Sequence, residues 1–121
     1  MPRPPRPAIF ILSLFFAAIS ACTVKVKPDF DSSFPQDRFA AIVQARQTND
    51  SSAVKPLISQ LASDDPLVRL AAVDTLRAIT GQHHDFNPAA KRQERRDGIK
   101  RWGVWFENES AGNAPDQEQS Q

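Results

Sequence analysis

Apolar residues recur at the spacing of α-helices through the middle of the chain, and the pattern predicts an all-α domain. The predicted helices cover residues 36–48, 53–62, 66–80 and 92–107. Residues 66–80 have the clearest limits, because Asp65 suits an N-cap, Pro66 suits the first helical position and Gly81 suits a left-handed stop. Ser52 is the expected N-cap of the second helix.

The third predicted helix is apolar on more than one side. One face carries Val68, Ala72, Leu76 and Ile79, and most other positions are also apolar: Leu67, Leu70, Ala71 and Val73. A helix of this kind has to be covered by more than one neighbour. Stacked pairs of helices meet that requirement, so the sequence favours a small α-α superhelix of about four helices.

Residues 53–81, AVKPLISQLASDDPLVRLAAVDTLRAITG, resemble one short bacterial HEAT repeat. The resemblance implies an antiparallel helical hairpin whose turn aspartate and Arg69 tie helix ends and neighbouring repeats together. It also implies a protein-binding surface without chemistry of its own. Such arrays usually need about three units, and this chain shows one, so flanking helices have to cap it.

The last predicted helix supplies such a cap. Ile99, Trp102 and Phe106 lie on one face, and Gly98 and Gly103 each cost about 1 kcal/mol in a helix interior, so packing has to hold it. Trp102 and Trp105 suit the core better than an exposed anchor for a partner. The expected repeat and interaction residues are Asp65, Arg69, Arg77, Trp102 and Trp105.

The first 21 residues have the layout of a secretory signal. Arg3 and Arg6 precede an apolar stretch, residues 8–18, which is shorter than the roughly 20 residues of a membrane-spanning helix. Small residues, Ser20 and Ala21, then precede Cys22, the single cysteine of the chain. One cysteine forms no intramolecular disulfide and is too few for a structural zinc site.

The sequence Ile19-Ser20-Ala21-Cys22 resembles the lipobox of bacterial lipoproteins. The resemblance implies that the Cys22 thiol receives a diacylglyceryl group, that the bond after Ala21 is cut, and that the new amino terminus is acylated, for example with palmitate. Several acyl chains hold a protein on a membrane more firmly than one. Thr23, which is not the aspartate that retains many such proteins in the inner membrane, slightly favours the outer membrane. The alternative is a soluble exported protein in which Cys22 has no role.

Charge and composition narrow the classes of function. Two of the 15 basic residues lie in the first 21 positions, which leaves 13 against 14 acidic residues in the remaining 100. This near balance argues against nucleic-acid binding. The sequence has no nucleophile with a base at motif spacing and no glycine-rich phosphate loop, so we expect no catalysis and no cofactor.

Two clusters remain as candidates for ligand binding. Residues 83–85, His-His-Asp, are metal-ligand types, but adjacent residues seldom point at one ion, and we expect no metal. The basic run within residues 91–101 is typical of a solvated surface. Its sharper interpretation is contact with anionic lipid head groups or with phosphate on a partner.

These observations predict four segments: a lipoprotein signal peptide at 1–21, a tether at 22–35, a HEAT-like helical domain at 36–109 and a disordered tail at 110–121. We expect a non-catalytic protein of the cell envelope that is anchored by its lipid and binds another protein. The alternative is a soluble exported periplasmic protein that binds a small ligand or metal through residues 83–85. A role as an accessory to an enzyme is a third interpretation.

Overall fold

The computed structural model describes residues 2–4, 23 and 25–113. Within them the chain is all-helical, as the periodicity predicts, with four α-helices and no strand. The α-helices are α1 (Pro35–Thr48), α2 (Val54–Gln60), α3 (Pro66–Thr80) and α4 (Arg92–Gly112), and a short 3-10 helix, η2 (Ser51–Ala53), precedes α2. The predicted signal peptide, Cys22 and residues 114–121 of the predicted tail lie outside the described residues.

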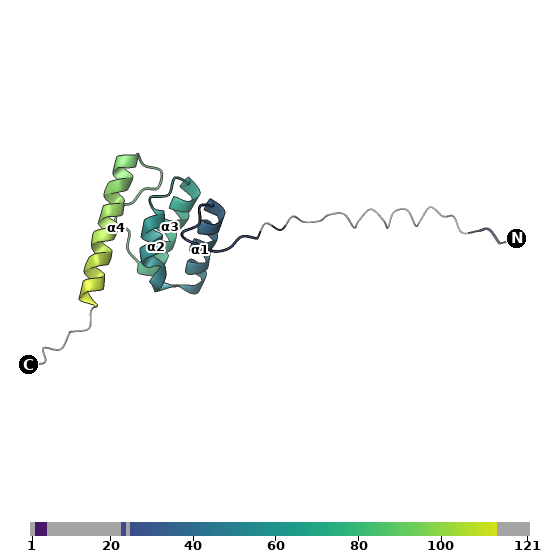
Figure 1. Ribbon diagram of the computed structural model, residues 1–121, viewed down its shortest axis with the longest axis horizontal. Helices are drawn as coiled ribbons and strands as arrows, with labels where there is room; N and C mark the ends of the chain where they lie inside the picture. Colours follow the sequence, from purple (N-terminus) through teal and green to yellow (C-terminus); the bar gives the residue numbers. More distant parts are fainter. Residues whose placement is uncertain (1, 5–22, 24, 114–121) are drawn as a thin grey trace, which may run out of the picture.

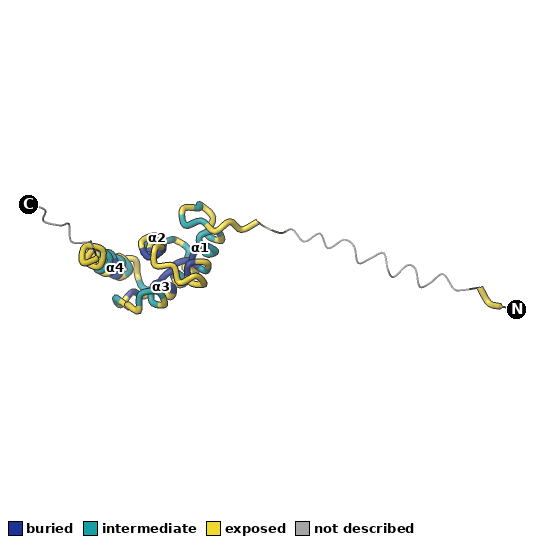
Figure 2. The backbone as a smooth tube through the Cα atoms, turned by 90° about the horizontal axis from the view of Figure 1, so that it is seen from below, coloured by how far each residue is buried: buried dark blue, intermediate teal, exposed yellow. Residues whose placement is uncertain are grey.

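Helices α2 and α3 form the centre of the domain, and α1 and α4 lie on opposite flanks (Figures 1 and 2). α3 packs against both α1 and α2, and α2 also contacts α4. Two neighbours therefore cover α3, as its two-sided apolar pattern predicts. The core that they enclose is mainly aliphatic with two aromatic side chains, and its fully covered members include Leu57, Leu61, Val73, Leu76, Phe86 and Trp102.

Local signals explain the limits of α1 and α3. The Asp65 carboxylate accepts hydrogen bonds from the backbone N–H groups of Leu67 and Val68, and Pro66 occupies the first helical position. Gly81 ends α3 with a positive φ of 71°, and Asn49 ends α1 with a positive φ of 49°. Glycine and asparagine are the residues that adopt this left-handed conformation most readily.

Helix α2 is shorter than the predicted helix 53–62 and begins differently. Asp50, not Ser52, caps the segment, because its carboxylate accepts hydrogen bonds from the backbone N–H and hydroxyl of Ser52. This local turn winds residues 51–53 into the 3-10 helix before α2 begins. The turn of residues 61–65 then reverses the chain into α3.

Helix α4 is longer than predicted, continuing past residue 107 to Gly112. Residues 108–112 are exposed, so no apolar pattern marks them in the sequence. A helix that has already begun extends at little cost through such polar residues. The predicted limit of the domain at 109 therefore falls inside α4.

Part of the predicted tether packs on the domain. The Phe30 side chain contacts the core, and its carbonyl accepts a hydrogen bond from the Gln60 side chain at 3.0 Å. The Arg38 guanidinium donates to the Ser32 carbonyl at 3.1 Å. The packed chain thus starts near Asp29 rather than at residue 36. We call this end of the bundle, where α2 ends and α3 and α4 begin, the proximal end, and the opposite one the distal end.

Candidate functional site

Arg69 joins the α2–α3 turn to the connection between α3 and α4. Its side chain is buried and donates hydrogen bonds to the carbonyls of Ser63 at 2.9 Å, Asp64 at 3.1 Å and Pro88 at 3.2 Å. Asp65 caps α3 beside it. The two residues that the HEAT resemblance singles out therefore lie together and fasten the end of one helix to the segment that leads to the next.

Three more arginines hold the loop that connects α3 to α4. Arg77 donates to the Phe86 carbonyl at 2.8 Å, Arg95 to the Ala90 carbonyl at 2.6 Å, and Arg101 to the carbonyls of His84 and Asp85. Arg77 also lies 3.6 Å from the Asp74 carboxylate. These guanidinium groups satisfy loop carbonyls that no helix or strand pairs. Arg77, which we expected at an interaction surface, thus supports the loop.

Trp102 forms the centre of an aromatic cluster under the same loop. It is fully buried, as the sequence favours, and its ring lies edge-on to His84 at 4.5 Å and to Trp105 at 5.6 Å between centroids. Trp105 is only partly buried, and its ring centroid lies 5.4 Å from that of His84. Neither tryptophan projects freely from the surface as an anchor for a partner would.

His84 is packed on the tryptophans and also lines an open hollow of about 430 Å³, together with Lys100, Arg101, Val104, Trp105 and Asn108. Its backbone, like that of Asp85, has a positive φ, of 45° and 47° respectively, and Arg101 bonds both carbonyls. Burial lowers the pKa of His84 below its ordinary value, and the nearby positive charge of Arg101 lowers it further. The described residues contain no group of three or more potential metal ligands, so residues 83–85 stand without a second cluster.

The close approach of Phe86 to α4 depends on Gly98, a requirement that the sequence does not reveal. A Cβ atom at Gly98 would lie 2.8 Å from the Phe86 Cδ2 and 3.3 Å from the Phe86 Cα. At Gly103 there is nothing within 4 Å of such an atom. The two glycines look alike in the sequence, and a long-range contact distinguishes them.

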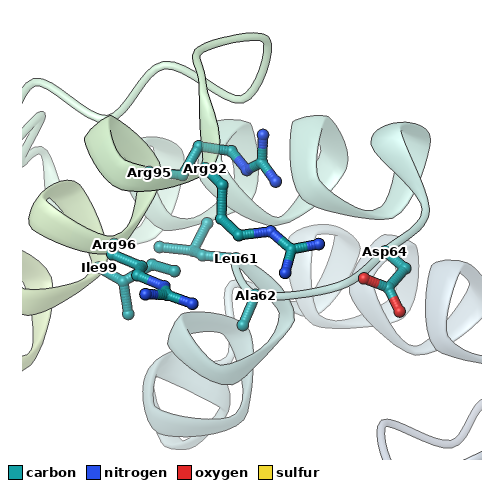
Figure 3. Close-up of a pocket in the computed structure, with 7 residues that line it drawn as sticks. All are labelled: Leu61, Ala62, Asp64, Arg92, Arg95, Arg96 and Ile99. Carbon is teal, nitrogen blue, oxygen red and sulfur yellow. The ribbon is translucent and has the colours of Figure 1, made fainter.

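The basic run divides into two groups with different surroundings. Arg95 and Arg101 hold the loop, whereas Arg92 and Arg96 are exposed and make no hydrogen bond or ion pair with the described residues. With Arg95 they line a groove of about 180 Å³ at the proximal end (Figure 3). The remaining lining residues come from the α2–α3 turn and from α4: Leu61, Ala62, Asp64 and Ile99.

Two exposed leucines lie on α3. Leu67 is 58% exposed and Leu70 is 44% exposed, although the sequence pattern predicts that neighbouring helices cover them. α1 and α2 take the other sides of α3, and the described residues place no third element over this face.

Comparison of the chain with known protein families, with curated proteins and with solved structures found no match.

Proposed function

We propose that this chain is a bacterial lipoprotein of the cell envelope, anchored through Cys22, whose HEAT-like helical domain binds another protein. The position of Cys22 supports the anchor most directly. It follows a positively charged start, an apolar stretch and the small residues Ser20 and Ala21. No helix in the described part of the chain has the length and apolar character needed to cross a membrane.

The distance between Cys22 and the folded domain is consistent with this proposal. The packed chain begins near Asp29, where its backbone N–H donates to the Asp37 carbonyl at 3.2 Å. A segment of this length spans at most about 25 Å when it is fully extended. An anchor at Cys22 would therefore hold the proximal end of the domain close to the lipid head groups.

The exposed face of α3 supports the binding of a protein partner. Leu67 and Leu70 lie one turn apart and leave large apolar side chains in water, which costs free energy that a partner would recover. The polar residue Asp74 follows on the same face. An apolar patch with a polar border is typical of a protein-binding surface.

Metabolic labelling with a fatty-acid probe tests the anchor. We expect the native chain to incorporate the probe and the Cys22→Ala variant to lose it, because Cys22 holds the acceptor sulfur. Thr23→Ala is the matched control and should keep the label. A protein that carries no label and is extracted without detergent would refute the anchor and favour the soluble exported binding protein.

Co-purification tests the binding surface. We expect a partner that is captured with the native chain to be lost with Leu67→Asp/Leu70→Asp, because charge on this face prevents apolar contact. Val104→Asp changes another exposed apolar side chain, on α4, and should retain the partner. Equal capture by all three chains would place the binding surface elsewhere.

A further inference from the structure

The groove at the proximal end gathers positive charge over an apolar floor. Leu61, which is fully buried, and Ile99 form the floor, and the side chains of Arg92, Arg95 and Arg96 lie around it (Figure 3). Asp64 is the one acidic residue of the lining. Three guanidinium groups thus face one carboxylate in the lining.

Most N–H donors of the guanidinium groups in this groove make no hydrogen bond within the described structure. Arg92 and Arg96 bond to nothing in the described structure, and Arg95 uses one nitrogen for the Ala90 carbonyl. The fork of an arginine matches two oxygens of a phosphate at once, which makes several arginines around one hollow a fitting site for a phosphate ester. A carboxylate offers fewer oxygens to three such forks.

The groove lies beside the segment that leads to Cys22. Ala62 and Asp64 line both this groove and the adjoining one, whose other wall contains Phe30, Asp31 and Ser32. The charges of the leading segment nearly cancel, since Lys25 and Lys27 precede Asp29 and Asp31. The excess of positive charge is therefore local to the groove, since Glu94 and Asp97 of α4 and the cap residue Asp65 also lie toward the proximal end.

Within the described structure, the hollow at the distal end has no basic residue in its lining. Glu109, Ser110 and Asn113 of α4 and its border lie there beside Ser51 and Val54. The three groove arginines lie in the first two turns of α4, and Glu107 and Glu109 lie in its last two turns. A negatively charged membrane would attract the groove arginines.

We propose that the groove lined by Arg92, Arg95 and Arg96 binds the phosphate of an anionic phospholipid head group and docks the proximal end of the domain on the membrane. The membrane part of this proposal rests on the proposed anchor at Cys22. The docked domain turns the distal end away from the lipid. Orientation, rather than attachment, is what the groove provides.

The test places the full, anchored chain in nanodiscs made of phosphatidylcholine alone or of phosphatidylcholine with phosphatidylglycerol. A spin label on the lipid head groups broadens the Nε–H signals of arginines that approach the membrane. We expect broadening at Arg92 and Arg96 in the discs that contain phosphatidylglycerol and little in the others. Arg46, at the distal end of α1, should stay sharp in both.

Variants assign the effect to the groove. Each basic side chain near an anionic surface raises binding about fivefold, so Arg92→Gln/Arg96→Gln should lower the ratio of docked to undocked domain about 25-fold. Arg46→Gln/Lys55→Gln removes the same charge at the distal end and should leave the ratio unchanged. Asp64→Asn removes the acidic residue of the groove and should raise the ratio.

The outcomes separate this proposal from the proposed function. Equal broadening in both kinds of disc, or an equal loss with both double variants, would overturn the groove as a lipid site. The arginine signals could instead shift to a limit as inorganic phosphate is added and show no response to phosphatidylglycerol. That result would assign the site to a free phosphate and overturn the membrane contact. A chain that carries no lipid but still binds phosphatidylglycerol vesicles through Arg92 and Arg96 would support the groove and refute the anchor.

Discussion

Gly98 and Gly103 both lie inside α4, yet replacing each with alanine should have opposite effects. Gly103→Ala gains about 1 kcal/mol of helix propensity and meets no atom within 4 Å. Gly98→Ala gains the same but forces a methyl group against Phe86, a clash that typically costs about 1 to 3 kcal/mol. We therefore expect urea unfolding to show a more stable Gly103→Ala and a less stable Gly98→Ala. A stabilised Gly98→Ala would contradict the observed packing of the loop on α4.

His84 should make the stability of the domain depend on pH. Its pKa is lowered in the folded state, so the unfolded chain binds more protons as the pH falls below the ordinary value of 6.5. Stability is therefore greatest above that value and declines as the pH falls toward the lowered pKa. Urea unfolding at about pH 7.5 and pH 5.5 measures the decline.

Two asparagine variants isolate the contribution of this histidine. His84→Asn should reduce the loss of stability on acidification, and asparagine tolerates the positive φ of this position. His83→Asn changes the exposed neighbour and should retain the loss that the native chain shows. If His84→Asn kept the full pH dependence, another group would be responsible.

At the scale of elements, Arg69 joins the α2–α3 hairpin to the connection that follows it. Arg69→Lys keeps the charge but loses the fork that reaches three carbonyls, so we expect it to lower the free energy of unfolding by about 2 to 4 kcal/mol. Hydrogen exchange of residues 82–91 should also become faster. Arg46→Lys, on the exposed part of α1, should change stability by less than about 0.5 kcal/mol. If Arg69→Lys left the free energy of unfolding unchanged, the positive charge alone would be sufficient to hold the connection.

The sequence predicts the limits of a helix when the residues that set those limits lie within the helix or directly beside it. The bounds of α3 follow from Asp65, Pro66 and Gly81, all within or beside the helix. The prediction of Ser52 as the cap before α2 is wrong, because two capping residues, Asp50 and Ser52, compete within three positions. The end of α4 is exposed and carries no apolar signal. Cap chemistry and helical periodicity act over a few residues, which is why they are visible in one sequence.

Most contacts of the candidate site join residues that are distant in the sequence, and local signals do not predict them. The burial of Trp102 follows from the spacing of apolar residues on α4, and the sequence predicts it. The bonds from Arg77 and Arg101 to the loop carbonyls span 9 to 17 residues, and no periodicity indicates them. The division of the basic run into loop supports and groove arginines likewise depends on how α4 packs against the α2–α3 turn.

At the scale of the whole molecule, attachment and orientation belong to different parts of the chain. Cys22 would fix the protein to the membrane, and the arginines of the proximal end would decide how the domain lies on it. Leu67 and Leu70 lie in the first turns of α3, at the proximal end, so a partner would bind beside the membrane. Each role has its own variant, so the loss of one leaves the others measurable.

The mass of the intact native protein tests the anchor, on which the rest of this arrangement depends. We predict a chain that begins at Cys22 and is heavier than its residues by a diacylglyceryl group and a further acyl chain. The Cys22→Ala variant should show neither the cleavage nor the added mass. A native protein that retains Met1, or one that begins near Cys22 with an unmodified thiol, would contradict the account.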